Sequence, residues 1–407
     1  MTPKAITFFY PYLYPNGVSE VFLRIGKYLT KKHSVKVRYI DYEEGYISKS
    51  LKEDKRFEVI HFSKNKQILL RGKDIFIMQS LLPFNIPKEL IFHSKTRVVF
   101  WSMHQLNFIP NIPFLSKCLI HRKRLHRFLL NHIATDNLKS TILELNKKKS
   151  LFFIDDSMRK FTEQRLGIAL KNPVFLPVPF EKEKLEKKQP KNNVNEINIG
   201  WLGMLYDFKI HILVYTLKAL SEYSKRKKIK INYFIIGKGP KQYLIKINEL
   251  ENEYFKVEFN KLMVGEVLKK FLLANVDIMT SMGTAALDSA KLGIPTVLLD
   301  VSYKPIKGNY RFRWIYDSIN CLGAIIDSTY FENGEKSIDR LLKEIEADYK
   351  RVSERTRMYC EENHSVGVVG KRFRETIQKS SFKYQDFNPL ILKKSLIRKS
   401  YEMIRNR

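Results

Sequence analysis

Short apolar runs alternate with an amphipathic stretch along the first quarter of the chain. Five such runs are rich in Val, Ile, Phe and Tyr, which is typical of buried β-strands. The stretch Ser19–Lys31 instead carries its apolar residues at helical spacing. Apolar strands separated by helices predict a parallel sheet covered on both faces. The predicted strands are Ala5–Tyr10, Ser34–Ile40, Val59–Phe62, Asp74–Gln79 and Arg97–Ser102.

A second series of the same kind follows a polar stretch. Glu181–Asn195 is rich in Lys and Glu and nearly free of apolar residues, which is typical of a linker. Beyond it, the pattern predicts the strands Ile197–Leu202, Ile229–Ile236, Val257–Phe259, Val276–Thr280 and Thr296–Asp300. Helical spacing recurs in Ile210–Tyr223, Val264–Ala274 and Ala285–Leu292, and Ser337–Arg407 is mostly helical.

The two series predict an α/β protein with two doubly wound parallel-sheet domains, for which 407 residues are ample. We expect an N-terminal domain at 1–180, a linker at 181–195, a second domain at 196–370 and a basic helical tail at 371–407. Two such domains leave a cleft between them. Ligands of open α/β sheets bind at the carboxyl ends of the strands, so we expect the functional loops to line that cleft.

Composition excludes several classes of protein. The chain is 44% hydrophobic and 13% aromatic, which excludes a disordered chain. No apolar run is long enough to span a bilayer, and the N-terminus lacks the features of a signal peptide. The three cysteines are too scattered for a disulfide framework or a zinc knuckle and fit a reducing cytosol. We therefore expect a cytoplasmic protein.

Charge is strongly unbalanced, because 73 Lys and Arg against 42 Asp and Glu give +31. Such a surface attracts polyanions and anionic membranes. Residues 115–130 and 389–407 combine basic residues with an apolar stripe, so they are candidates to bind the inner face of the plasma membrane. The alternative is a packed helix with a solvated basic face. The chain has no recognised nucleic-acid motif, so we expect no specific nucleic acid as partner.

Two predicted strands of the second series end in glycine loops. After Ile199–Gly203, Lys209 follows near the start of the next helix, which is a reasonable seat for a phosphate. The alternative is a turn glycine and a solvated lysine. Another strand ends in Gly237 and Gly239, where the backbone can approach a ligand closely; the spacing is not that of a dinucleotide fingerprint.

The segment 281–297 is the most informative. A strand ends at Thr280, and Gly283 and Thr284 open a helix, so their amides point outward in an arrangement that suits a diphosphate. Asp288 lies about one turn further on, where a carboxylate can hold a ribose diol. Gly-Ile-Pro at 293–295 then leads into a strand. The alternative is an ordinary βαβ unit with a capped helix.

These segments, in this order and spacing, resemble the donor half of the GT-B glycosyltransferases, in particular the retaining, metal-independent family 4-like group. That group has a glycine loop with an Arg and a Lys, a strand ending in Gly-x-Gly-Pro, and two glutamates eight residues apart before Gly-Ile-Pro or Gly-Leu-Pro. Residues 10–20, 35–37, 154–158 and 175–179 are similar to its acceptor half. The resemblance covers most of residues 1–300 and implies two Rossmann-like domains that face a cleft.

The resemblance also implies roles for single residues. Lys209 matches the lysine that binds the donor phosphate, and Gly283 and Thr284 match the amides that hold the diphosphate. Asp288 stands at the second acid, the ribose ligand. In the acceptor half, Gly17 matches the loop that faces the sugar phosphate. His104 matches a strand-end histidine near the transferred sugar, with a histidine bonded to a backbone carbonyl as the alternative.

Two departures from the family pattern stand in the donor half. Met204 replaces the phosphate-binding arginine, and Thr280 replaces the first acid. Loss of a bidentate guanidinium weakens recognition of a diphosphate. We expect Arg311 and Arg313, with Lys304 and Lys307, to be candidates for replacement charge, because they follow the strand Thr296–Asp300.

The implied reaction transfers a sugar from a nucleotide-diphosphate sugar to a glycan or lipid-linked acceptor, as in bacterial surface polysaccharide biosynthesis. The leaving diphosphate gains negative charge, which Lys209 and the helix start at 283–284 can stabilise without a metal. The chain has no Asp-x-Asp motif, and we expect no cofactor besides the donor. The alternatives are a sugar-nucleotide epimerase of the same fold and a non-enzymatic basic protein that binds nucleic acid or membranes.

Overall fold

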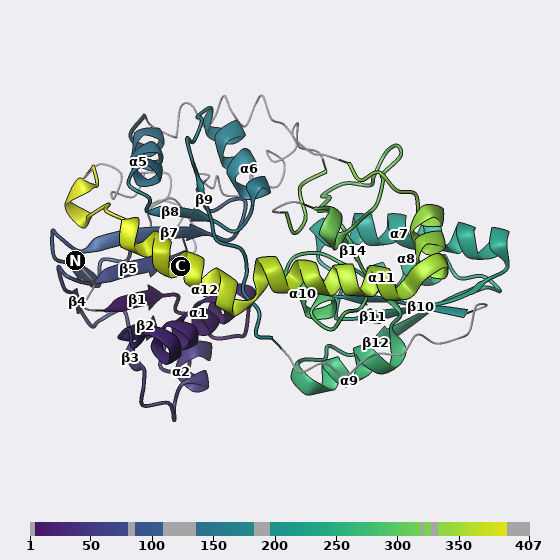
Figure 1. Cartoon of the computed structure of the whole chain (residues 1–407), viewed down its shortest axis with the longest axis horizontal. Helices are drawn as coiled ribbons and strands as arrows, with labels where there is room; N and C mark the ends of the chain where they lie inside the picture. The colour runs from purple at the N-terminus through teal and green to yellow at the C-terminus, as the bar shows by residue number, and fades with distance from the viewer. Residues whose placement is uncertain are drawn as a thin grey trace. The chain divides into compact units, whose positions relative to one another are not determined.

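The computed structural model describes residues 5–79, 86–108, 136–182, 196–318, 321–326 and 333–388. Its contacts divide the chain into two compact units (Figure 1). The first unit consists of Met1–Pro179 and Val366–Arg407, and the second consists of Phe180–Ser365. The chain therefore leaves its first unit once and later returns to it.

The first unit is built on a seven-stranded sheet in the order β3-β2-β1-β5-β7-β8-β9, in which every neighbouring pair is parallel. Its central strands are fully buried, which explains why they are apolar throughout. The strands are β1 (Ile6–Phe9), β2 (Val37–Asp41), β3 (Glu58–His61), β5 (Ile75–Met78), β7 (Arg97–Ser102), β8 (Leu151–Phe153) and β9 (Val174–Phe175). A separate parallel pair joins β4 (Ile68–Leu70) to β6 (Leu90–Phe92).

Helix α12 (Val366–Lys379) completes the first unit from the far end of the sequence. It packs against α1 (Gly17–His33), and a side chain on Gly370 would collide with Tyr28. Its buried Phe373 lies in contact with the rings of Phe8 and Trp101. The other helices of this unit are α2 (Tyr46–Ser50), α5 (Asp136–Lys147), α6 (Asp156–Leu166) and the 3-10 turn η2 (Tyr384–Asp386).

The second unit has a six-stranded sheet in the order β12-β11-β10-β13-β14-β15. All pairs are parallel except β14 with β15. The strands are β10 (Glu196–Leu202), β11 (Lys230–Ile236), β12 (Phe255–Asn260), β13 (Ile278–Ser281), β14 (Thr296–Leu298) and β15 (Arg313–Trp314). The helices are α7 (Asp207–Lys227), α8 (Lys241–Asn248), α9 (Gly265–Asn275), α10 (Thr284–Ala290), α11 (Ile338–His364) and the 3-10 turn η1 (Ile315–Asp317).

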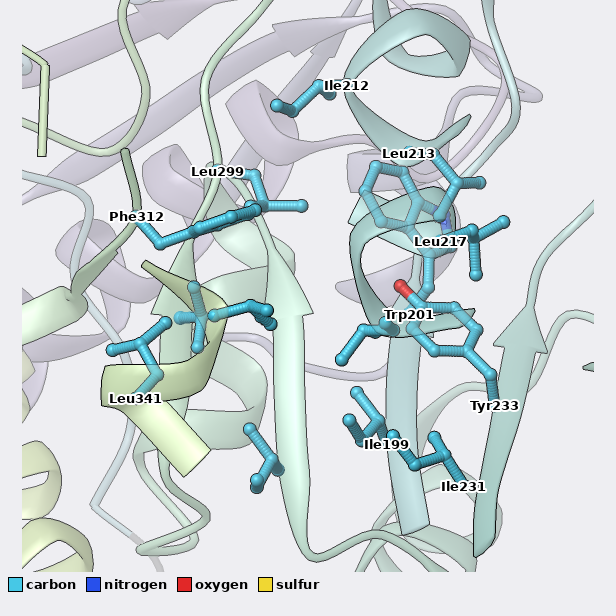
Figure 2. Packing of buried hydrophobic residues seen from close by; sticks show 14 of the residues in the cluster. Ile199, Trp201, Ile212, Leu213, Leu217, Ile231, Tyr233, Leu299, Phe312 and Leu341 are labelled. Carbon is cyan, nitrogen blue, oxygen red and sulfur yellow. The ribbon is translucent and has the colours of Figure 1, made fainter. Parts of the chain in front are cut away.

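Alternate residues of β10 pack into different cores on the two faces of this sheet. Ile199 and Trp201 belong to a core that also contains residues of α7 and α11, and Figure 2 shows Trp201 beside Leu213 of α7. Leu202 points the other way, into a smaller cluster that contains residues of α9. Coverage of both faces confirms the prediction of a doubly wound parallel sheet.

The predicted strands of both series and their connecting helices are present, most with bounds shifted by one to three residues. Residues 366–379 differ from expectation, because they belong to the first unit rather than to the second domain or a separate tail. These residues form α12, which packs against α1. The predicted linker lies largely outside the described residues, at 183–195. Within the described part of the chain, no helix is both long and apolar enough to cross a membrane.

Candidate functional site

Three loops meet at the carboxyl edge of the second unit's sheet. The loop after β10 is hydrogen-bonded to the end of β11 and the loop that follows it. Gly203 N donates to Ile236 O at 3.0 Å, and Leu205 N donates to Lys238 O at 2.8 Å. The loop after β14 reaches the first turn of α7, which follows the loop after β10, through Ser302 N, which donates to Phe208 O at 3.0 Å. Backbone bonds therefore hold these loops in one place before any ligand binds.

The glycines after β11 serve this contact between loops. A Cβ on Gly237 would lie 2.1 Å from the carbonyl oxygen of Gly203, and a Cβ on Gly239 would lie 2.4 Å from the Cβ of Leu205. Both distances are shorter than any side chain tolerates. Packing between loops therefore requires glycine at both positions, and the expectation that these glycines let a ligand approach stays a prediction.

Gly203 and Lys209 lie together at the end of β10. Gly203 has φ +140°, a region that favours glycine, and a Cβ there would lie 3.3 Å from the Nζ of Lys209. Lys209 is in the first turn of α7, where its backbone N donates to Tyr206 O at 2.9 Å. The structure thus places the predicted lysine at the predicted glycine loop.

The ammonium of Lys209 is half-buried without an anionic partner. No carboxylate of the described residues lies within ion-pair distance of it, and its Nζ lies 5.7 Å from the centre of the Phe208 ring. Burial lowers the pKa of Lys209 below its ordinary value. A cation held away from water without a counter-charge is costly, so this position favours an anionic ligand.

The start of α10 lies at the neighbouring strand, because β13 pairs with β10. Gly283 has φ +61° and open space around its missing side chain. However, its amide donates to Leu322 O at 2.7 Å, which differs from the expectation that this amide holds a diphosphate. Thr284 is exposed and opens a helix that has no side-chain cap, so its amide has no partner within the helix.

Asp288 lies one turn into α10, on the same side as Thr284. Its carboxylate forms an ion pair with Lys291 at 3.3 Å and is about one third exposed. The carboxylate is therefore solvent-accessible at the predicted place, with a cation beside it.

The two departures from the family pattern occupy different environments. Thr280 is buried, and its hydroxyl donates to Gly200 O at 3.0 Å and bonds to the Tyr233 hydroxyl at 2.5 Å. Thr280 thus joins three strands of the sheet, which explains why a polar residue is tolerated there. Met204 is half-buried in the loop after β10.

Arg313 belongs to a buried network. Its guanidinium contacts Asp300 at 2.6 Å and the hydroxyl of Ser318 at 2.6 Å, and the Asp300 carboxylate also accepts from Tyr310. Burial lowers the pKa of Arg313, but the adjacent Asp300 carboxylate more than offsets this and raises it. Arg313 is therefore committed to Asp300, contrary to the expectation of replacement charge. The side chain of Arg311 is exposed.

In the first unit, Gly17 begins α1 at the carboxyl end of β1. The preceding Asn16 caps this helix, since its Oδ1 accepts from the amides of Val18 at 2.9 Å and Ser19 at 3.1 Å. These amides are consequently used within the loop. Gly17 itself is exposed.

His104 follows β7 in a tight turn. Its Nδ1 accepts from the amide of Leu106 at 3.1 Å, which requires the proton of a neutral ring to sit on Nε2. The side chain is accessible to solvent, yet desolvation by the surrounding protein lowers the pKa of His104. No backbone carbonyl of the described residues accepts a hydrogen bond from the ring, which differs from the alternative of a carbonyl-bonded histidine. The ring presents an Nε2–H donor.

Asn107 is a residue that the sequence analysis missed. It is buried, and its Oδ1 accepts from the amides of Met103 and His104, both at 2.8 Å. Gln79 donates to the same oxygen at 3.3 Å. An Asn in a loop after a strand is a general turn signal, but its bonds to the amides that precede it are visible only in the folded loop. Asn107 positions the loop that carries His104.

Other expectations lie outside the described residues. The basic stretches 115–130 and 389–407 fall in the ranges 109–135 and 389–407 that the structure does not describe. In the described ranges, no group of three or more His, Cys, Asp or Glu side chains is arranged to hold a metal ion.

Comparison with known proteins gives matches in structure. No protein-family model matches the chain, and no curated protein matches it in sequence. A glycosyltransferase of Rickettsia africae is similar, with a TM-score of 0.57 and 14% identity over 97% of this chain and 100% of that chain. So is the lipopolysaccharide outer core galactosyltransferase WaaB, with a TM-score of 0.52 and 12% identity over 92% and 99%. A TarM variant of S. aureus, in complex with UDP among other ligands, has a TM-score of 0.54 and 11% identity over 92% and 99%.

These neighbours are GT-B glycosyltransferases, and each match covers nearly the whole of both chains. At this level of identity the likeness concerns the fold. Together with the two parallel sheets described above, it shows that the chain has the GT-B fold, with two Rossmann-like domains.

Proposed function

We propose that the chain is a glycosyltransferase that moves a sugar from a nucleotide-diphosphate sugar to a glycan or lipid-linked acceptor. The observation that carries the proposal is the half-buried ammonium of Lys209 beside Gly203, with no carboxylate partner among the described residues. A diphosphate supplies the missing negative charge. The fold supports the same choice, because neighbours described as glycosyltransferases share it, one of them in complex with UDP.

In the proposed reaction, Lys209 stabilises the charge that grows on the diphosphate as the glycosidic bond breaks. The exposed amide of Thr284 and the carboxylate of Asp288 are proposed to bind the diphosphate and the ribose. The neutral His104 donates from Nε2 to a sugar hydroxyl. We further propose a retaining reaction with no resident metal or cofactor, in which the acceptor attacks on the face of the leaving group and passes its proton to the departing phosphate.

Bacterial surface polysaccharide biosynthesis is the proposed setting. WaaB is described as a lipopolysaccharide outer core galactosyltransferase, and it shares this fold. A lipid-linked acceptor would bring the protein to the cytoplasmic face of the plasma membrane, where the positive charge of the chain favours anionic lipids.

Nucleotide binding tests the proposal. The full chain is screened by thermal shift with UDP, GDP, dTDP and CMP and with the sugar conjugates of the best nucleotide. We expect one nucleotide diphosphate to stabilise the protein, and Lys209→Met to weaken its affinity by roughly 30-fold, or about 2 kcal/mol, because a desolvated charge pair is lost. The exposed Lys218 on the same helix provides the control Lys218→Met, which should bind as the wild type does.

The results of the nucleotide screen distinguish the proposal from its alternatives. Absence of binding to every nucleotide, or equal loss in the two variants, contradicts the proposal. If the bound nucleotide sugar is consumed without acceptor and the product is still a nucleotide sugar, the epimerase alternative is correct instead.

A further inference from the structure

An exposed cluster of aromatic and apolar side chains lies in the loop between β1 and α1. Tyr12, Leu13 and Tyr14 are 42%, 49% and 68% exposed, an unusual concentration for large apolar side chains. The ring of Tyr12 stacks on that of Tyr10 at 5.6 Å and meets that of Tyr14 edge-on at 6.5 Å. These three rings form a continuous surface, here called the tyrosine platform.

Asp41 fixes the backbone of the loop at Tyr12, the middle ring of the tyrosine platform. This carboxylate is fully buried and accepts four backbone N–H bonds. Its Oδ1 takes the amide of Tyr12 at 2.9 Å, and its Oδ2 takes the amide of Ile47 in α2 at 2.9 Å. In addition, the amide of Tyr46 donates to Tyr12 O at 2.8 Å. A loop tied in this way loses little entropy when a ligand binds.

The platform occupies a place where a ligand is expected. It follows the carboxyl end of β1, a central strand of the first unit's parallel sheet, and ligands of such sheets bind at this edge. The same loop carries Gly17 at the start of α1.

The side chains of this loop indicate which kind of ligand it can bind. Residues 9–19 contain no charged side chain, although 28% of the whole chain is charged. A surface for anionic lipid would need basic residues, and a nucleotide phosphate would need a cation. Flat tyrosine rings with hydroxyls at their edges instead match a sugar ring, which has an apolar C–H face and polar hydroxyls around it.

We propose that the tyrosine platform binds a sugar ring of the acceptor, so that the acceptor is a saccharide or carries one. The inference rests on the proposed glycosyl transfer for its place in the reaction, but binding to the platform is independent of donor binding. Tyr12 and Tyr14 are specificity-determining residues in this assignment, and Asp41 positions the backbone of Tyr12.

An oligosaccharide array tests the proposal with the labelled full-length protein. We expect the wild type to capture at least one printed oligosaccharide. The double variant Tyr12→Leu with Tyr14→Leu keeps apolar bulk but removes the rings, and we expect about tenfold weaker capture, since aromatic contacts are each worth a few-fold in affinity. Tyr14→Phe keeps the stacking face and should retain capture.

Two controls separate folding from recognition. Leu69→Ala changes a side chain on β4 that is 74% exposed, and it should leave capture unchanged. Tyr14→Leu alone alters a ring that is mostly in solvent, so its melting temperature should equal that of the wild type. The nucleotide thermal shift of each variant should also match the wild type, since Lys209 is intact.

Three outcomes overturn the proposal. The first is a wild-type protein that captures no oligosaccharide, and the second is equal capture by the double variant. The third is a double variant that no longer binds phosphatidylglycerol vesicles but still binds saccharides, which would make the platform a lipid surface. If capture of saccharides depends on the tyrosine rings but no nucleotide binds, the platform proposal stands and the glycosyltransferase proposal fails. If a nucleotide binds but capture does not depend on the rings, only the platform proposal fails.

Discussion

At the scale of single residues, a cationic side chain serves different ends according to its surroundings. Lys209 and Arg313 are both cations at the carboxyl edge of the second unit's sheet. Arg313 is neutralised by Asp300, whereas Lys209 has no carboxylate partner among the residues the structure describes. Sequence position alone suggested a ligand role for both. The difference arises because Asp300, at the end of the neighbouring strand, faces only one of them.

Loss of Arg313 should affect stability rather than donor binding. Arg313→Met leaves Asp300 buried and unpaired, so we expect the free energy of unfolding to fall by about 3 kcal/mol in chemical denaturation. Arg311→Met, at an exposed position, should change it by less than about 0.5 kcal/mol. A weaker nucleotide affinity in either variant at a temperature where both are folded would instead support replacement charge.

Acid should destabilise the protein partly through His104. Desolvation holds the pKa of His104 below its ordinary value of 6.5 in the folded chain. As pH falls below 6.5, the unfolded chain takes up the proton first, so stability decreases until the folded ring also protonates. We expect ring NMR to show a midpoint below 6.5. We also expect His104→Gln to reduce the pH dependence of unfolding between that midpoint and pH 6.5; equal slopes would contradict the assignment.

At the scale of elements, apolar strands were the most predictable feature. Strand β7 has the predicted bounds, Arg97–Ser102, because four residues of high β propensity lie between the polar Arg97 and Ser102. Strands β4, β6, β8, β9 and β15 were not predicted, since two or three residues are too few to show a period. The glycine loops were predicted by position, but their contacts with one another were not.

The contact between the loops after β10 and β11 can be tested at Gly237. In Gly237→Ala the new Cβ would meet the Gly203 carbonyl at 2.1 Å, and backbone cannot move aside easily. We expect a loss of about 1–3 kcal/mol in stability and weaker nucleotide binding, as the loop beside Lys209 shifts. Gly367→Ala is the control, since its Cβ meets nothing within 4 Å and its helix should gain up to about 1 kcal/mol. Unchanged nucleotide affinity in Gly237→Ala would contradict a shared site.

At the scale of the whole molecule, the chain builds two units but does not divide between them at a single point. Helix α12 belongs to the first unit, far from its other elements in sequence. Its Phe373 packs against Phe8, Trp101 and Phe152. The stability of the first unit therefore depends on residues that follow the whole of the second.

Phe373→Ala should destabilise one unit selectively. Removal of a buried ring costs about 3–5 kcal/mol, so we expect the unfolding transition of the first unit to move to a lower temperature. The transition that responds to nucleotide should not move, because Lys209 lies in the second unit. Met358→Ala, at a half-exposed position on α11, serves as the control. Equal shifts of both transitions would show that the units unfold together.

Local patterns along the chain were sufficient to predict the α/β class, the two parallel sheets and the glycine loops that end their strands, because apolar period and turn chemistry act over a few residues. Such patterns also placed Lys209 correctly at the start of a helix. The pairing of Arg313 with Asp300, the use of the Gly283 amide by Leu322 and the return of α12 to the first unit depend on neighbours distant in sequence. Those outcomes follow from packing and charge in three dimensions, which no local pattern encodes.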